Sequence, residues 1–463
     1  MLSTPRRKPP APSLPTTRFI PSSPSSHYKD RPRHLSLRLK LQLFLRRPIT
    51  LLTLFLAVFL TLAWALGLVG PGGERVRTGG GPRVLARDWS VGLAQREGKG
   101  GAVVLQNGTI LPAMTYNETV LILCPMRNAI EHIWHFFHLL SLLSYPPHLI
   151  HLAILVSDSS DGTYQRALEL ADERQYSRRF RGKRFGRITV LQKDFAENEE
   201  GAYSGENVGA ERHKYEAQVG RRKLLAKSRT WLLQSAVAPE ADWALWLDVD
   251  LVDYEPQMIE RLLGHARGEI GEGGGADVVV PNCVWKTYNE MGPYDRNNWI
   301  ETPESLELKK TLNSTDVLIE GYPSHPTHRF NLASLVPPTP LSLSPLSPYF
   351  LPPSFPLSSL PSSPPLPSSL SSLTTIPSEL DLDGIGGCAA LVRADVHREG
   401  AVFPAWPPVD HQIETEGLAQ MVKALRRPRG GARGESEEVK YGKGGRGRLL
   451  GLPTYYVYHG LYG

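Results

Sequence analysis

Two carboxylates, Asp248 and Asp250, follow the apolar run 243–247. Residues spaced i and i+2 on an extended chain point to the same side, so both side chains could face one hard cation such as Mg²⁺ or Mn²⁺. Because these ions accept a site completed by substrate phosphates, the pair suits an enzyme that neutralises charge on a leaving diphosphate. A plain acidic turn, with Asp253 and Glu255 as further surface charges, explains the same residues without chemistry.

The stretch DVDLV (248–252) also fits the aspartyl-phosphate pattern D-x-D-x-[TV]. In that pattern Asp248 would be the nucleophile and Asp250 an acid or base. It predicts a nucleophile early in the domain and a later pair of acids for Mg²⁺. Here residues 117–247 precede the motif and no Asp-Asp pair follows it in the sequence. The order of elements therefore favours a transferase over a phosphotransferase.

Short apolar runs alternate with segments of helical spacing around the two acids. This alternation predicts an α/β domain with a mostly parallel sheet. Ligands of such sheets bind at the carboxyl ends of strands, which is where Asp248 and Asp250 are expected. The expected strands are 119–125, 149–158, 187–195, 243–250 and 276–285.

Charge is divided unevenly along the chain. Residues 1–47 contain eleven Lys and Arg and one acid, whereas the other residues contain 41 basic and 45 acidic side chains. A nucleic-acid-binding domain needs its basic charge on the folded part, so this balance predicts no nucleic-acid partner.

An apolar segment follows the basic tail. Residues 49–69 carry no charge, and 21 helical residues at ~1.5 Å each cross a hydrocarbon core of ~30 Å. We therefore expect a transmembrane anchor at 48–70, with the tail at 1–47 in the cytosol by the positive-inside rule. Residues 71–116 are rich in Gly and Arg and are expected to be a stem, which leaves 117–463 as the lumenal domain.

Residues 332–378 break the pattern, because they are dominated by Pro, Ser and Leu and contain no acid. Such a composition is not expected to build a packed core. Since a structureless loop of that length is improbable in a compact domain, we interpret it as an insertion. A translated intron would look the same.

Two other sets of residues could bind metal. Cys124, Cys283 and Cys388 are too widely spaced for a zinc motif, which leaves either one disulfide and a thiol or three buried thiols. Three histidines recur in EHIWHFFHLL (131–140), but a spacing of three drifts around a helix by about 60° per step. This segment is expected to be a packed amphipathic helix.

Four motifs in order resemble one known family, the fungal Golgi mannosyltransferases of glycosyltransferase family 62, which are subunits of the mannan polymerase complexes. The resemblance covers residues 117–331 and 379–463. The motifs are WLDVDLVDYEPQMIERLL, VVVPNCVW, DLDGIGGCAALVRADVHREGAVFP and IETEGLAQMVKAL.

The resemblance implies a type II Golgi membrane protein whose lumenal domain has a GT-A fold. It implies Mn²⁺ (or Mg²⁺) as cofactor, GDP-mannose as donor, α-mannan chains of N-glycans as acceptor, and retention at the anomeric carbon. Its partners would be other mannan polymerase subunits. A scaffold subunit without turnover would carry the same motifs.

The resemblance also assigns residues to the donor. Asp248 and Asp250 would hold the metal and the diphosphate, and His459 is expected as a third metal ligand, since neutral imidazole suits Mn²⁺. Guanidinium pairs with phosphate in bidentate fashion, so Arg222 or Arg229 could meet the diphosphate. The residues expected to lie against the nucleotide are Pro125, Arg127, Asn128 and Asp158.

On the acceptor side, the motifs LDGIGG and IETEG supply the candidates. Glu414 is the expected acceptor-side acid. Gly386 and Gly387 would allow the backbone to approach a sugar closely. Asp383 and Glu416 would bind hydroxyl groups or orient the acceptor.

Overall fold

The computed structural model describes residues 117–195, 214–271, 274–286, 291–336, 370–425 and 447–460, with short strands between 83 and 116 and parts of 349–367. The chain divides into two units, Met1–Arg75 and Val76–Gly463, and every described residue belongs to the second. The predicted tail (1–47) and anchor (48–70) lie outside the description. Within the described ranges, no helix has both the length and the apolar character needed to cross a membrane.

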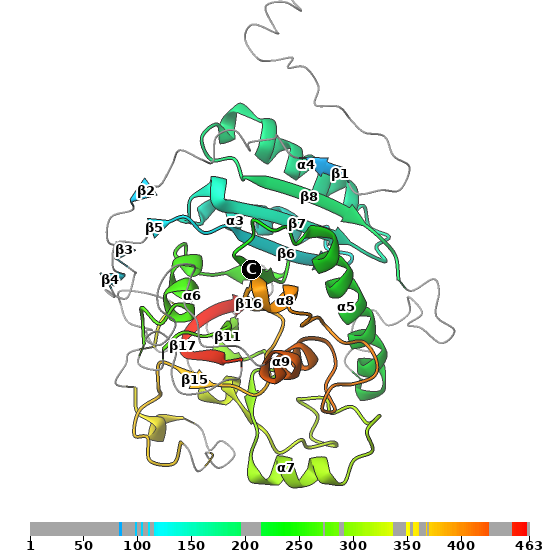
Figure 1. Ribbon diagram of the computed structural model, residues 1–463, viewed down its shortest axis with the longest axis vertical. Helices are drawn as coiled ribbons and strands as arrows, with labels where there is room; N and C mark the ends of the chain where they lie inside the picture. The colour runs from blue at the N-terminus through cyan, green and yellow to red at the C-terminus, as the bar shows by residue number, and fades with distance from the viewer. Residues whose placement is uncertain are drawn as a thin grey trace, which may run out of the picture. The chain divides into compact units, whose positions relative to one another are not determined.

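Four parallel strands form the first half of the central sheet (Figure 1). In spatial order they are β8 (Arg187–Gln192), β7 (Ile150–Val156), β6 (Val120–Met126) and β9 (Trp243–Leu247). Helices separate them in the sequence, as crossover connections between parallel strands require. This half confirms the predicted parallel α/β arrangement.

The second half of the sheet is mixed. β16 (Ala389–Arg393) lies antiparallel between β9 and β11 (Val278–Lys286). β17 (Leu449–His459) runs parallel to β11, and β10 (Leu251–Asp253) pairs antiparallel with β17. The prediction of a mostly parallel sheet is wrong here, because a strand from late in the sequence enters between two earlier ones. With β1 (Arg83–Leu85) at one edge, the order along the sheet is β1-β8-β7-β6-β9-β16-β11-β17-β10. Off this path, β12 (Met291–Pro293) pairs with β11 and β15 (Leu380–Asp381) pairs with β17.

Helices cover both faces of this sheet. Even-numbered residues of β6 join the core beneath one set of helices, and odd-numbered residues join the core beneath the other, as the strand period of two requires. The first face is covered by α3 (Ile133–Leu142), α4 (Thr163–Tyr176) and α6 (Met258–Ala266). The second is covered by α5 (Tyr215–Ala236) and α9 (Glu414–Ala424).

Shorter elements complete the description. α7 (Pro303–Lys310) begins with a capping box, in which Thr302 and Ser305 satisfy each other's backbone N–H groups. β1 (Arg83–Leu85), from the predicted stem, pairs with β8. The others are α8 (Ala394–Arg398), β2 (Gly98–Lys99), β3 (Val103–Val104), β4 (Ile110–Leu111), β5 (Thr115–Tyr116), β12 (Met291–Pro293), β13 (Trp299–Ile300), β14 (Phe330–Asn331), β15 (Leu380–Asp381) and the 3-10 turns Pro147–Leu149, Arg178–Phe180, Leu332–Leu335 and Leu357–Ser359.

The segment 332–378 is not wholly separate from the core. Its described apolar residues, among them Leu335, Leu351 and Ile376, are buried in a cluster with Tyr456 and Tyr458 of β17. The expectation that this composition packs nowhere is therefore wrong for these residues. Large apolar side chains spaced between the prolines and serines are enough to cover one face of β17.

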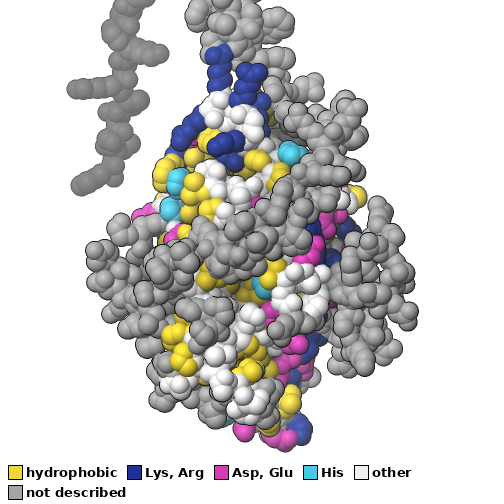
Figure 2. Space-filling model, turned by 90° about the vertical axis from the view of Figure 1, so that its left-hand side faces the viewer, with side chains coloured by type: hydrophobic (Ala, Val, Ile, Leu, Met, Phe, Trp, Pro, Cys, Tyr) yellow, Lys and Arg dark blue, Asp and Glu magenta, His cyan; other side chains and the backbone are white. Residues whose placement is uncertain are grey.

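Basic side chains gather locally despite the acidic balance of the domain. Figure 2 shows Lys and Arg side chains over the end of the unit that carries α4 and β8. In the connection between these elements, Arg178, Arg179, Arg181 and Lys183 are exposed. This face is therefore basic, although the domain as a whole has more acidic than basic residues.

The cysteines and histidines singled out in the sequence have structural explanations. Cys124, Cys283 and Cys388 are free and buried, which confirms the alternative of three thiols. The histidine-rich segment forms α3, as expected, and Nε2 of His135 lies 2.7 Å from the carbonyl oxygen of Val252.

Candidate functional site

The two aspartates lie at the carboxyl end of β9, and each has a different partner. Oδ1 of Asp248 accepts a hydrogen bond of 3.0 Å from Nη2 of Arg229. Oδ2 of Asp250 lies 3.0 Å from Nε2 of His459. The strand ends at Leu247 and residues 249–250 form a turn, so the alternation of an extended chain no longer applies. That both acids face one cation stays a prediction.

Arg229 links Asp248 to Glu414. It lies on α5, and its Nε is 3.0 Å from Oε1 of Glu414, the first residue of α9. The Arg229 side chain is 4% exposed, whereas that of Asp248 is 30% exposed. Nη1 of Arg229 is buried and has no hydrogen-bond partner within the described part of the chain. Because an unpaired buried donor is costly, this nitrogen is suited to an oxygen supplied by a ligand or a water molecule.

The surroundings shift the pKa values of the two aspartates in opposite directions. Burial raises the pKa of Asp248 to about 7, with Arg229 opposing this and neighbouring carboxylates reinforcing it. Burial also acts to raise the pKa of Asp250, but contact with the imidazole of His459 outweighs it and lowers that pKa. At neutral pH, Asp250 is therefore an anion and Asp248 can carry a proton.

Asp250 and His459 are the residues best placed to hold a cation. The ring of Tyr294 stacks on His459 at 3.8 Å between centroids and so fixes the imidazole plane. Nε2 of His459 is buried without an aligned hydrogen bond from any described residue. Among the residues that the structure describes, no group of three or more His, Cys, Asp or Glu is arranged around one metal position. The residues therefore fit an ion completed by substrate oxygens and water rather than a protein cage.

The expected nucleotide loop forms at the carboxyl ends of β6 and β7. Arg127 Nε donates to the carbonyl oxygen of Asp158 at 3.1 Å, and the Asn128 side chain accepts from the backbone N–H of Ser160 at 2.9 Å. Asn128 and Asp158 both have positive φ, 45° and 49°. Pro125 lies within β6, next to this loop. The structure thus brings the four predicted residues together at the end of two adjacent strands.

Arg222 and Glu416 form a buried ion pair with each other. Arg222 also donates to Oδ1 of Asn297 at 2.9 Å, and Nε1 of Trp299 donates to Glu416 at 2.8 Å. Arg222 is 6% exposed and Glu416 is 1% exposed. Their predicted contacts with phosphate and acceptor would require this buried network to open. Arg229 is buried as well, at 3% exposed, but it contacts Asp248, whose side chain is 30% exposed.

The predicted acceptor glycines serve close packing inside the protein. A Cβ atom at Gly386 would lie 1.7 Å from Oδ2 of Asp295, and one at Gly387 would lie 2.7 Å from Nη2 of Arg229. Glycine is thus needed so that these two charged groups can approach the backbone. The predicted approach of a sugar to the same glycines remains a prediction.

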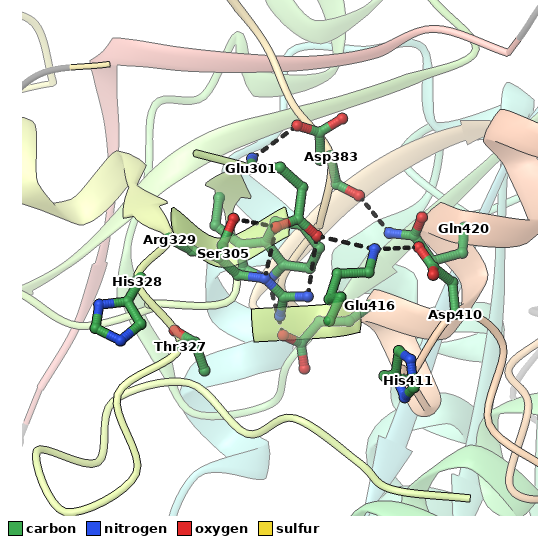
Figure 3. Close-up of polar contacts among 12 residues, drawn as sticks. Glu301, Ser305, Thr327, His328, Arg329, Asp383, Asp410, His411, Glu416 and Gln420 are labelled. Carbon is green, nitrogen blue, oxygen red and sulfur yellow. Dashed lines mark hydrogen bonds and ion pairs between the residues drawn. The ribbon is translucent and has the colours of Figure 1, made fainter. Parts of the chain in front are cut away.

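Asp383 connects three segments rather than standing open. Its carboxylate accepts a 2.8 Å hydrogen bond from the backbone N–H of Glu301 and contacts Lys423, and its carbonyl oxygen accepts from Gln420 at 2.7 Å (Figure 3). Arg329 is bound nearby by Glu301. Asp383, the acid of the motif LDGIGG, therefore has a structural role in joining these segments.

Sequence reasoning missed Tyr294 and Asp295. They follow β11, whose carboxyl end lies at the same edge as that of β9, on the far side of β16. The signal was available, because the polar stretch PYDRNN (293–298) comes soon after a buried strand.

The solved structures that resemble the chain do so distantly. One is TarS 1-349 of S. aureus, with 12% identity, a TM-score of 0.33, and coverage of 74% of this chain and 60% of that chain. Another is the mannosyltransferase PcManGT from Pyrobaculum calidifontis in complex with GDP-Man and Mn²⁺, with 10% identity, a TM-score of 0.32, and coverage of 73% and 56%.

Curated relatives match much more closely. The chain is 34% identical to the mannan polymerase II complex anp1 subunit of Schizosaccharomyces pombe over 66% of its length, and 32% identical to the ANP1 subunit of Saccharomyces cerevisiae over 74%. It spans 60% and 55% of those two relatives. It is also 32% identical to the S. pombe mannan polymerase complex subunit mnn9, of which it spans 80%. Residues 107–407 match the Anp1 family model. These matches confirm the resemblance expected from the motifs, and the chain belongs to the Anp1 family.

Proposed function

We propose that this chain is a metal-dependent mannosyltransferase that moves mannose from GDP-mannose to the α-mannan chains of N-glycans, with retention. It would act as a Golgi membrane subunit of a mannan polymerase complex, with its domain in the lumen. Membership of the Anp1 family and the subunit names of its relatives support this proposal. The observation that carries it is Nη1 of Arg229, a buried donor without a partner among the described residues, together with the contact of Asp250 with His459.

Each residue of the site has a separate role in this proposal. Asp250 and His459 would hold Mn²⁺, which supplies charge neutralisation on the leaving diphosphate. Arg229 would add a fixed positive charge through its free Nη1, held in place by Asp248 and Glu414. The open side of Asp248 would accept or donate a hydrogen bond to a sugar hydroxyl, according to its protonation.

The Asp250→Asn variant tests this proposal. It keeps the size of the side chain but removes the charge that pairs with His459, so mannose transfer from GDP-mannose to α-mannobiose with Mn²⁺ should fall by about a hundredfold or more. The matched control is Asp253→Asn, three residues further on, where the carboxylate accepts from the Tyr349 hydroxyl at 2.9 Å and transfer should be retained. Equal transfer by wild type and Asp250→Asn would refute the catalytic role.

A scaffold subunit without turnover is the second candidate. One observation favours it: Asp248 is bound by Arg229 and Asp250 contacts His459, so each acid already has a partner within the chain. The same assay separates the two functions. A scaffold predicts no transfer by wild type, while the Asp250→Asn variant still assembles with partner subunits.

A further inference from the structure

A turn that follows α7 contains an acceptor pattern for N-linked glycosylation. Residues 313–315 read Asn-Ser-Thr, which fits N-x-[ST] with a residue other than Pro in the middle. The same pattern occurs at 107–109 and at 117–119. Such triplets are frequent by chance, so the sequence alone does not select among them. The surroundings of each asparagine decide which one can carry a bulky group.

The turn at Asn313 is closed by its own polar groups. The backbone N–H of Asp316 donates to the carbonyl oxygen of Asn313 at 2.9 Å. The backbone N–H and Nδ2 of Asn313 both donate to Oδ2 of Asp316, at 2.8 and 3.2 Å. An amide nitrogen that carries a sugar keeps one hydrogen, and the contact with Asp316 needs only one. The turn therefore does not have to open to accommodate the bond.

This turn lies at the surface of the domain. Asn313, Ser314 and Thr315 are all exposed, and within α7 itself only Ser305 is buried. Figure 1 shows α7 at the opposite end of the unit from α4 and β8. A glycan on Nδ2 of Asn313 would therefore extend into solvent without displacing a packed side chain.

The other two patterns are placed differently. Residues 107–109 lie outside the described residues. Asn117 is exposed, but the two residues that follow it take part in the fold, just before β6. The carbonyl oxygen of Glu118 accepts from the Tyr145 hydroxyl at 2.6 Å, and the backbone N–H of Thr119 donates to Oδ2 of Asp242 at 2.7 Å. Of the two described patterns, 313–315 is the one whose hydrogen bonds all stay within its own turn.

We propose that Asn313 carries an N-linked oligosaccharide. In the reaction, Nδ2 of Asn313 forms a bond to the anomeric carbon of an oligosaccharide that is supplied on a lipid diphosphate. The bond between that carbon and the diphosphate breaks, the diphosphate leaves with the lipid, and the amide loses one proton to the host's oligosaccharide transferase. No group is oxidised or reduced. This inference rests on the lumenal placement in the proposed function and not on the transfer of mannose.

Two matched variants of the full chain, expressed in a eukaryotic cell, test the proposal. Thr315→Ala destroys the pattern but leaves Asn313 and Asp316 in place, whereas Ser314→Ala, at the neighbouring exposed position, leaves the pattern complete. Wild type and Ser314→Ala should migrate more slowly than Thr315→Ala on a denaturing gel, by the mass of one glycan. A peptide N-glycosidase should abolish the difference. In heavy-oxygen water the same enzyme should leave a labelled aspartate at position 313, which mass spectrometry of the peptide locates.

A reporter distinguishes failure of this inference from failure of the proposed function. The reporter is an Asn-Ala-Thr triplet in a flexible Gly/Ser tag added after Gly463. If the tag carries a glycan and Asn313 does not, the domain is lumenal and the inference is wrong. If neither carries one, the lumenal placement is wrong and the inference fails with it. If Asn313 carries a glycan but the protein transfers no mannose, the inference stands and the transferase function fails.

Discussion

His397 should make the domain lose stability in mild acid. Its Nε2 accepts a 3.2 Å hydrogen bond from Nε1 of Trp246, and its Nδ1 lies 2.8 Å from the carbonyl oxygen of Ala401. These two partners require the neutral ring, since a proton on Nε2 would face the N–H of Trp246. Burial, with a smaller contribution from Arg398, lowers the pKa of His397 to about 4.

The size and sign of the effect follow from that pKa. Because the folded-state pKa is lower than the unfolded value of 6.5, the stabilisation is fully present above 6.5 and is lost as pH falls toward about 4. The full shift corresponds to about 3 kcal/mol, and about 2 kcal/mol of it is lost by about pH 5. Since Trp246 belongs to β9, which ends one residue before Asp248, this loss weakens the support of the candidate site.

Urea unfolding of wild type and His397→Gln measures the effect. Between about pH 7.5 and about pH 5, wild type should lose roughly 2 kcal/mol more unfolding free energy than the variant, because glutamine does not titrate. His138→Gln, at an exposed position of α3, should behave like wild type. If wild type and His397→Gln lose the same amount, the neutral-ring argument is wrong.

Two further predictions follow from the packing around the site. Arg229→Gln should lower the free energy of unfolding by about 3–5 kcal/mol, since it leaves the carboxylates of Asp248 and Glu414 without their counter-ion; a loss below 1 kcal/mol in urea unfolding would show that the pairs contribute little. Gly386→Ala should lower the melting temperature, because its Cβ would overlap Asp295. Gly220→Ala on α5, where no described atom lies within 4 Å of the added Cβ, should leave it unchanged or raise it, and equal effects would contradict the packing argument.

Much of the first half of the sheet could be predicted from the sequence, because its strands are buried on both faces and read as continuous apolar runs. The position of Asp248 and Asp250 at a strand end followed from the same rule. Their partners did not, because Arg229 and His459 lie on other elements. The strand pattern predicts where a residue lies on the backbone. The direction of its side chain depends on tertiary contacts.

The mixed half of the sheet was harder to predict for a topological reason. β16 pairs with β9 and β11, although residues 287–388 separate it from β11 in the sequence. Likewise, Leu351 and Ile376 pack on β17 although their surroundings read as low complexity. Long-range pairing of this kind leaves no periodic signal in any local window.

The place of β16 also sets the order in which the domain can be completed during synthesis. The strands β6 to β9 emerge from the ribosome well before residues 389–393, so β9 has an open edge until β16 arrives. An apolar strand with unpaired backbone groups is a template for pairing with another chain. The nascent protein therefore passes through a stage in which the strand that leads to Asp248 is open to intermolecular association, and the demand on chaperones should be greatest there.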